Sequence, residues 1–386
     1  MTIFLIFYCV YAAGNVYVFL KVRHIFHPGI LTSVLLGLFL AFMTFSPTLI
    51  HLCSSYCPYT LTKIYAYPGY MWVAVIVFFS SVGILLDLYN FIVRTGSFIL
   101  QNNSIKKIST SQRASFFITV FFTIALTVYG YFEARNLQVE KLTVKTSKLP
   151  ENVRKLTIVQ ISDVHLGIMV RGTILDQVLK IVTDAKPDLI VSTGDLVDNE
   201  VSHIAYLAGK LKTANSRLGK FAVTGNHEFY GGIENTVKFM QDSGFTVLRS
   251  EGVNIQNLIN IAGIDDGAVK DFEPAENISR KSVRKIISEL PRKTFTILLN
   301  HRPEIDGDAL GTFDLMLSGH THKGQIFPIR IIPKLLFPVD SGYAKLPKGS
   351  SVYVSRGAGT AGPPVRFLAP PEVTIIEIVR ETQTNK

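Results

Sequence analysis

Cysteine is scarce in this chain, which has three cysteines among 386 residues. Three cysteines cannot form the framework of several disulfides that stabilises small secreted domains. Cys53 and Cys57 lie close together and, in an oxidising compartment, would form either one bridge or two free thiols. A zinc site there is disfavoured, because no second cysteine pair exists and the local histidine, His51, is single. A metal site after Cys57 would therefore have no thiolate ligand.

Acidic residues are also few, since 29 Asp and Glu accompany 39 Lys and Arg for a net charge of +10. Half of that excess lies before residue 134, where the acidic residues are Asp87 and Glu133. The remaining chain is only mildly basic and has no patterned basic run, so no nucleic-acid partner is expected. A mild positive bias does suit anionic phosphate substrates or lipid headgroups. Internal repeats and low-complexity tracts are absent as well.

Long apolar stretches are concentrated at the N-terminus. The chain is 48% hydrophobic with a mean hydropathy of +0.30, which is too apolar for an ordinary soluble protein. Four stretches approach the ~20 apolar residues that cross a bilayer, namely 3–20, 30–50, 70–93 and 114–132. We expect a four-helix transmembrane region over residues 1–132, and hence a multi-pass protein of the plasma or inner membrane. A signal peptide is the alternative for the first stretch, but it lacks a basic leading segment and three more stretches follow.

Charges in this region predict an orientation. Six basic residues occupy the connections between the first and second and between the third and fourth stretches, whereas only Lys63 lies between the second and third. Because cytoplasmic connections carry the excess of Lys and Arg, the domain after residue 132 is expected outside the cytoplasm. Asp87, inside the third stretch, should face the bundle interior or lie near the interface as a hydrogen-bonded carboxyl rather than act as a proton relay. Four basic residues after the fourth stretch favour the opposite orientation: Arg135, Lys141, Lys145 and Lys148.

Five short apolar stretches in the second part of the chain each end in Asp, Asn or His. Residues 155–161 lead into Asp163 and His165, and alternation along an extended chain sends residues i and i+2 to the same side. These two side chains can therefore offer an oxygen and a nitrogen to one divalent metal. Residues 189–193, 220–224, 295–299 and 313–317 lead into further polar residues: Asp195, Asp198, Asn226, His227, Glu228, His301, His320 and His322. One such strand end is usually a solvated turn, but five in order predict a ligand site at the carboxyl edge of a sheet.

Helical and extended patterns alternate in this part of the chain. Residues 171–184 have an apolar stripe at helical spacing, and residues 201–211 and 232–241 are further expected helices. Residues 137–146 alternate as an edge strand would. We expect a linker and edge strand over 133–150 and a layered α/β domain over 151–386.

The ordered motifs resemble those of the calcineurin-like metallophosphoesterase family over roughly residues 138–380. They are DVH at 163–165, GDLVD at 194–198, GNHE at 225–228, NH at 300–301 and GHTH at 319–322. Segments 299–303, 318–325 and 354–357 are most similar to its small membrane-associated branch, typified by YkuE and YaeI. Lys323 departs from that branch, which usually has glycine there, and this bears on substrate range rather than on the metal site. The resemblance implies two packed sheets flanked by helices, an α/β/β/α domain that would follow the N-terminal α-helical transmembrane bundle.

The resemblance also implies a pair of divalent metal ions, Mn, Fe or Zn, which such nitrogen and oxygen ligands suit. The implied ligands of the first ion are Asp163, His165, Asp195 and His322, and those of the second are Asp195, Asn226, His301 and His320. Asp195 would bridge the ions, because a shared anion offsets their repulsion, and a bridging hydroxide would attack the phosphorus atom in line. His227 would contact the phosphate and protonate the leaving oxygen. Asp198 and Glu228 would orient loops or ligands.

The expected activity is that of a membrane-anchored phosphohydrolase, either a phosphodiesterase or phosphomonoesterase or a pyrophosphatase. Its partners would be the bilayer and a phosphate ester, which is lipid-linked or else a nucleotide or cyclic nucleotide. A UDP-diacylglucosamine-type pyrophosphatase would require the domain to face the cytoplasm. The alternative is a catalytically silent metal-binding receptor or scaffold on the same fold. A transporter is disfavoured, because four spans with one intramembrane acid offer no obvious pathway.

Residues 326–347 form an apolar segment interrupted by prolines, which we expect to prevent regular helix. The segment follows His320 and His322 directly. It would either contact lipid or an acyl chain, or pack onto its own domain.

Overall fold

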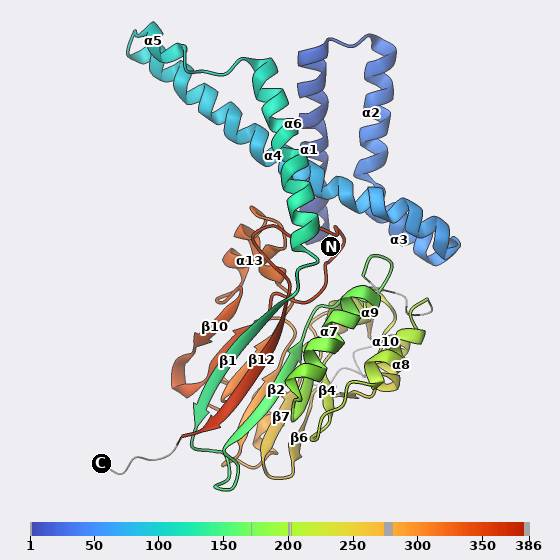
Figure 1. Cartoon of the computed structure of the whole chain (residues 1–386), viewed down its shortest axis with the longest axis vertical. Helices are drawn as coiled ribbons and strands as arrows, with labels where there is room; N and C mark the ends of the chain where they lie inside the picture. The colour runs from blue at the N-terminus through green and yellow to red at the C-terminus, as the bar shows by residue number, and fades with distance from the viewer. Residues whose placement is uncertain (1, 171, 200, 202, 274–280, 382–386) are drawn as a thin grey trace. The chain divides into compact units, whose positions relative to one another are not determined.

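The structure is a computed structural model that describes residues 2–170, 172–199, 201, 203–273 and 281–381 (Figure 1). The chain divides into two compact units. The first comprises residues 1–132 with 362–365, and the second comprises residues 133–361 with 366–386. Each unit has hydrophobic clusters of its own, so each is described by itself.

Within the described part of the first unit, three helices are long and apolar enough to cross a membrane. They are α1 (Thr2–Phe26), α4 (Tyr59–Ile99) and α6 (Gln112–Glu133). They contain three of the predicted spans. The short helix α5 (Asn103–Lys106) lies in the connection between α4 and α6. At about 1.5 Å per residue, the 41 residues of α4 exceed the ~30 Å hydrocarbon thickness of a bilayer, so part of this helix must lie outside it.

The span predicted over residues 30–50 is broken. Helices α2 (Ile30–Thr44) and α3 (Ser46–Tyr56) meet at an angle of 53°. Pro47 lies in the first turn of α3, where the missing backbone N–H is tolerated, whereas in the interior of one continuous helix it would remove a hydrogen bond and clash with the preceding turn. The structure therefore has a fourth candidate span only if this bent pair is counted as one.

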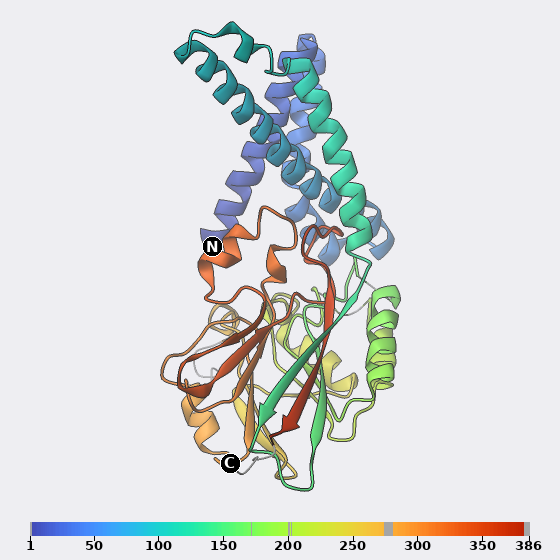
Figure 2. The same ribbon diagram turned by 60° about the vertical axis from the view of Figure 1, so that its left-hand side comes forward.

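The second unit contains two six-stranded sheets (Figure 2). The strands of the first sheet in spatial order are β1 (Gln138–Thr146), β12 (Glu372–Arg380), β2 (Lys155–Ile161), β3 (Leu189–Ser192), β4 (Lys220–Ala222) and β5 (Thr246–Val247). In this sheet β12 is parallel to β1 and antiparallel to β2, and β2, β3, β4 and β5 are parallel to one another. The second sheet has the spatial order β10 (Gly342–Lys345), β11 (Ser351–Val354), β9 (Leu315–Ser318), β8 (Phe295–Leu299), β7 (Ile259–Gly263) and β6 (Glu251–Ile255).

The main core lies between the two sheets. Ile158 and Val191 of the first sheet pack in one cluster with Ile261 and Ile297 of the second, and all four are fully buried. Helices α7 (Gly172–Ala185), α8 (Tyr206–Lys212) and α10 (Ile233–Asp242) contribute to a second cluster, on the outer face of the first sheet. Helix α12 (Val283–Ser288) covers the outer face of the second sheet. The expected α/β/β/α architecture is therefore confirmed.

Two local expectations differ from the structure. Helix α8 starts at Tyr206 rather than at residue 201, and Ser202 lies outside the described residues. Residues 326–347 do contain a helical turn, α13 (Ile331–Leu336), so the expectation of no helix there is wrong. Pro333 is the third residue of α13, and the first N–H groups of a helix have no intrahelical partner, so proline is tolerated at that position.

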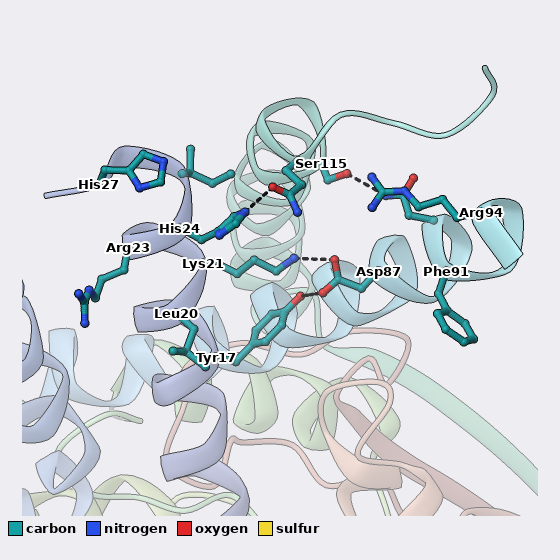
Figure 3. Close-up of a pocket in the computed structure, with 13 residues that line it drawn as sticks. Tyr17, Leu20, Lys21, Arg23, His24, His27, Asp87, Phe91, Arg94 and Ser115 are labelled. Carbon is teal, nitrogen blue, oxygen red and sulfur yellow. Dashed lines mark hydrogen bonds and ion pairs between the residues drawn. The ribbon is translucent and has the colours of Figure 1, made fainter. Parts of the chain in front are cut away.

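The expectation of a hydrogen-bonded carboxyl at Asp87 is confirmed. In a cavity among α1, α4 and α6, Asp87 accepts a hydrogen bond from Tyr17 at 2.8 Å and forms an ion pair with Lys21 at 2.5 Å, as Figure 3 shows.

Candidate metal centre

The predicted ligands follow strands that end at the same edge of the two sheets. Strands β2, β3 and β4 are parallel neighbours in the first sheet, and β8 and β9 are parallel neighbours in the second. Within each sheet the tips are joined, because Asp163 N–H donates to Gly194 O at 3.1 Å and Gly319 N–H donates to His301 O at 2.9 Å. A third bond joins the two sheets: the backbone N–H of His320 donates to Asp163 Oδ1 at 2.9 Å.

The glycine of the GDLVD motif is required by its surroundings. Gly194 has a φ of +92°, and a Cβ atom there would lie 2.6 Å from His301 Nδ1. A side chain at this position would therefore separate the tips of β3 and β8, which the site needs close together.

Five site residues have left-handed backbone conformations that non-glycine residues rarely adopt. Their φ values are 49° for Asp163, 51° for His165, 49° for Asp195, 69° for His320 and 46° for His322. Each such residue costs of order 1–3 kcal/mol, and strain of this kind clusters at functional sites. The rest of the fold therefore offsets the strain of these five conformations. An ordinary solvated turn has no packing that would offset it.

Asp163, His165 and His322 form a first group whose potential ligand atoms all lie within 4.8 Å of one another. The Nε2 atoms of the two histidines are 3.0 Å apart, and His322 Nε2 is 3.5 Å from Asp163 Oδ1. All three side chains are buried. Two imidazole nitrogens and a carboxylate oxygen that converge in this way fit one divalent cation.

Asp195, His301 and His320 form a second group of the same kind. Asp195 Oδ2 is 3.2 Å from His301 Nε2, and His301 Nε2 is 3.2 Å from His320 Nδ1. His301 Nδ1 contacts the carbonyl of Thr193 at 2.8 Å, which leaves Nε2 directed at the group. Asp195 Oδ2 is also 3.8 Å from His165 Nε2, so this one oxygen faces both groups.

An unpartnered polar atom at the site provides a test of whether cations fit. Among the described residues, Oδ1 of Asn226 is buried and has no hydrogen-bond partner. A buried polar atom without a partner costs about 1–3 kcal/mol and requires an explanation. Asn226 is the first residue of α9 (Asn226–Tyr230), which follows β4, and a cation ligated by its Oδ1 would satisfy that atom.

His227, Asp198 and Glu228 adjoin the two groups. His227 Nδ1 donates to the carbonyl of Asp198 at 2.6 Å, and the Asp198 carboxylate is 3.2 Å from the same nitrogen and 3.4 Å from His165 Nδ1. The fully buried Glu228 carboxylate accepts from the backbone N–H groups of Gly225 at 2.6 Å and Asp195 at 2.9 Å. The structure therefore brings all ten predicted site residues together.

Burial and charge distribute protons unevenly over the histidines. Burial opposes the protonated form of His301, but the charge and hydrogen bond of Asp195 outweigh it and raise the pKa of His301 to about 10. The same balance, with Asp195 and Asp198, raises the pKa of His227 to about 10. Burial lowers the pKa of His320 to about 3, and the charge of His301 adds to this effect. The buried carboxylates thus favour positive charge in the site, and bound cations would supply that charge.

One residue at the site was not predicted. Arg366 is fully buried, and its Nη2 atom is 3.0 Å from His322 Nδ1. Burial lowers the pKa of Arg366 to about 10, so the group stays charged at neutral pH. Burial and the charges of His165 and Arg366 hold the pKa of His322 well below its usual value, and neutral imidazole is the form that binds metal. The sequence does contain a signal that could have identified Arg366. It is the one charged residue of segment 357–371, which is rich in glycine, proline and apolar residues and has no acidic residue.

Comparison with known proteins gives the same picture. The calcineurin-like phosphoesterase family matches residues 156–324. An uncharacterized metallophosphoesterase of Aquifex aeolicus is 40% identical over 260 residues, which cover 67% of this chain and 98% of that protein. A transmembrane protein with metallophosphoesterase domain of Danio rerio is 29% identical over 317 residues, 77% of this chain and 72% of that protein. The uncharacterized metallophosphoesterase YkuE of Bacillus subtilis is 34% identical over 264 residues, 65% of this chain and 89% of that protein.

Proposed function

The chain belongs to the calcineurin-like metallophosphoesterase family, and from this premise we propose that it is a membrane-anchored phosphohydrolase that uses two divalent cations. The observation that carries the proposal is the position of Asp195. Its Oδ2 atom lies between His165 Nε2 at 3.8 Å and His301 Nε2 at 3.2 Å, so one anionic oxygen serves both groups. A shared anion is what two adjacent cations require, because it offsets their repulsion.

The residues that would hold the cations are the two groups already described, with Asn226 added to the second. This set of imidazole, carboxylate and amide donors suits Mn, Fe or Zn. When bound, such a pair supplies a nucleophilic water at neutral pH and neutralises the oxygens of the phosphoryl group. Asp163 and Asp195 are buried, so their charges act in a low-dielectric environment where electrostatic interactions are strong.

His227 has the geometry of a general acid. Its Nδ1 proton is held by the Asp198 carbonyl, and the Asp198 carboxylate stabilises the protonated ring. Nε2 is thus left to hold a proton for the leaving oxygen of the ester. Proton transfer by a positioned histidine contributes about 10²- to 10⁴-fold to a rate.

A lipid-linked substrate is supported by an apolar surface next to the site. On α13, Ile331, Ile332, Leu335 and Leu336 have exposed fractions of 55–81%, and the Phe337 ring, which follows them, lies 5.9 Å from the His320 ring. Exposed apolar surface of this kind marks a contact with a partner or a membrane. Together with the membrane-spanning helices, it favours a phosphate ester presented by the bilayer over a free nucleotide.

The loop charges favour the extracytoplasmic side for the catalytic unit. A reporter fused after residue 386 tests this directly. Activity of a reporter that works only outside the cytoplasm is expected, and activity of a cytoplasmic reporter alone would contradict it.

The function is tested on the purified full-length chain with Mn²⁺ and a generic phosphodiester. Asp195→Asn removes the shared anion, so bound metal and hydrolysis should be lost together. His227→Gln should retain metal and lose about 10²- to 10⁴-fold in kcat. Metal content without turnover in the wild type would instead support a catalytically silent receptor or scaffold. If both variants hydrolysed the ester as the wild type does, the assigned roles would be wrong.

The lipid-linked substrate is tested with the double variant Leu335→Ser/Leu336→Ser. It should lower turnover of a phosphodiester presented in vesicles and leave turnover of a soluble one unchanged. Tyr206→Ser removes a similarly exposed apolar side chain on α8 and serves as the control. Equal effects on both substrates, or none on either, would remove the support for lipid presentation.

A further inference from the structure

A chain of buried hydrogen bonds ends on Asp163, an implied ligand of the first cation. Its members are Gln160, Thr193, Ser162 and Asp163, and their exposed fractions are 0–1%. Gln160 Nε2 lies 3.0 Å from Thr193 Oγ1, and Thr193 Oγ1 lies 2.7 Å from Ser162 Oγ. Ser162 Oγ in turn contacts Asp163 Oδ2. Three polar side chains of the core are thus connected in series to one metal-binding carboxylate.

The direction of donation along this chain is fixed at both ends. The Ser318 carbonyl of the second sheet can only accept, so the Gln160 amide nitrogen donates to it at 3.0 Å and uses its second N–H for Thr193. At the other end, the Asp163 carboxylate accepts. Each hydroxyl has a single proton, so Thr193 donates to Ser162 and Ser162 donates to Asp163. Hydrogen bonds that run in one direction strengthen one another, and here they strengthen the donation to Asp163 Oδ2.

This donation sets the rotation of the Asp163 carboxylate. With Oδ2 bonded to Ser162, Oδ1 is the oxygen that lies 3.5 Å from His322 Nε2 in the first group. Gly319 permits the arrangement, because a Cβ atom there would lie 2.0 Å from Ser162 Oγ and 2.1 Å from Asp163 Oδ2. A carboxylate that is already held in one rotation loses little further freedom when it binds a cation.

Thr193 also contacts the second group, through its backbone. Its carbonyl oxygen accepts from His301 Nδ1 at 2.8 Å, and His301 Nε2 lies 3.2 Å from Asp195 Oδ2. Histidines that bind metals are commonly oriented by a carbonyl at the other ring nitrogen. Thr193 therefore acts on a ligand of each cation, with its hydroxyl for one and its carbonyl for the other.

We propose that Thr193 is a positioning residue for both cations, and that its hydroxyl fixes Asp163 through Ser162 while its carbonyl fixes His301. Two-metal hydrolysis requires ions about 3.5–4 Å apart. A residue that orients a ligand of each ion keeps the two groups at a constant separation. The proposal rests on the proposed function in one respect, the binding of two cations. It goes beyond it by assigning their relative position to a residue that would ligate neither.

The test titrates Mn²⁺ into metal-free full-length protein by calorimetry with a competing chelator, so it does not depend on turnover. Thr193→Val removes the hydroxyl and retains the side-chain shape and the carbonyl. It should weaken one of the two Mn²⁺ sites by about 10- to 100-fold, as loss of an orienting partner does, and leave the other site unchanged. Thr193→Ser restores the hydroxyl and should restore the affinity. A loss that Thr193→Ser does not rescue would overturn the proposal.

Two backgrounds identify the site that is weakened. His320→Ala removes a ligand of the second cation, and the remaining first site should still lose affinity when Thr193→Val is added. His322→Ala removes a ligand of the first cation, and Thr193→Val should have no effect there. Ser162→Ala breaks the same chain, so its combination with Thr193→Val should weaken Mn²⁺ binding no more than either change alone. Equal losses in both backgrounds, or additive losses in the combined variant, would refute the assigned role.

Thr296→Val is the matched control. Thr296 is a buried threonine whose Oγ1 also accepts from an amide, Asn260 Nδ2 at 3.0 Å, and donates to an oxygen, the Thr294 carbonyl at 3.2 Å, and neither partner is a site residue. Thr296→Val should bind both ions as the wild type does, and the same loss of Mn²⁺ affinity there would show general destabilisation and exclude a positioning role.

The titration also separates this proposal from the proposed function. A wild type that binds two Mn²⁺ ions, with unchanged affinities in Thr193→Val, would contradict the role of Thr193 alone. A wild type that binds no Mn²⁺ would contradict the proposed function as well.

Discussion

Replacement of Arg366 by methionine is the most informative single change at the metal centre. The guanidinium is fully buried, and no carboxylate of the described residues is hydrogen-bonded to it; its contacts are to backbone carbonyls and His322. It donates to four carbonyls: Gly359 O at 2.6 Å, Arg356 O at 2.9 Å, Ala369 O at 3.0 Å and Gly357 O at 3.1 Å. Methionine fills a similar volume but donates nothing, so these carbonyls would lose their buried donor.

The expected cost can be worked from those contacts. An unsatisfied buried polar group costs about 1–3 kcal/mol, and four carbonyls with partial relaxation give about 3–5 kcal/mol, the range measured when a buried ion pair is broken. For a unit of this size, a loss of 1 kcal/mol lowers Tm by about 2–4 °C, so the metal-free variant should unfold about 6–20 °C earlier. Loss of a group that orients a metal ligand costs about 10- to 100-fold in metal affinity.

The assay combines thermal unfolding of the metal-free protein with a chelator-competition titration of Mn²⁺ affinity. A second comparison locates the effect: if Arg366 acts on the metal through His322, the change in affinity should largely vanish in a His322→Ala background. The Tm loss should persist there, because the backbone contacts do not involve His322. An unchanged Tm in the metal-free variant, or affinity losses that simply add, would refute this reasoning.

Three further outcomes are expected. Glu228→Gln replaces a carboxylate that accepts from two backbone N–H groups of the site, so it should lower Tm and weaken metal binding together, as measured by unfolding and metal content. Gly359→Ala should destabilise by about 1–3 kcal/mol or more, because its Cβ would lie 1.9 Å from Val164 O; Gly307→Ala, where the Cβ meets nothing within 4 Å, should be near neutral in the same unfolding assay. Chelation should lower Tm by removing the charge that compensates the buried carboxylates. Mn²⁺ should restore it and Ca²⁺ should not, because the histidine-rich groups suit transition metals.

The metal centre could be predicted because its determinants are local. Asp163, Asp195, Asn226 and the histidines each follow a short apolar strand directly, and parallel strands that are neighbours in a sheet end at one edge. The types of these side chains indicate metal binding. Their order along the chain indicates the family, and the comparisons confirm that family. The two-sheet architecture followed from that resemblance rather than from the pattern of single strands.

Other features depend on contacts between residues far apart in the chain. A hydropathy window averages over residues 30–50 and does not detect the bend between α2 and α3. Arg366 lies 44 residues from His322, and Asp87 lies 66 residues from Lys21, so neither contact leaves a pattern in its own segment.

The sequence by itself thus determined the class of chemistry, because each metal-ligand side chain can be recognised from the short strand that it follows. Only the tertiary structure decided which buried cation contacts His322 and which cation pairs with Asp87. Burial and pairing of charges are properties of the packed chain, and no short window of sequence contains them.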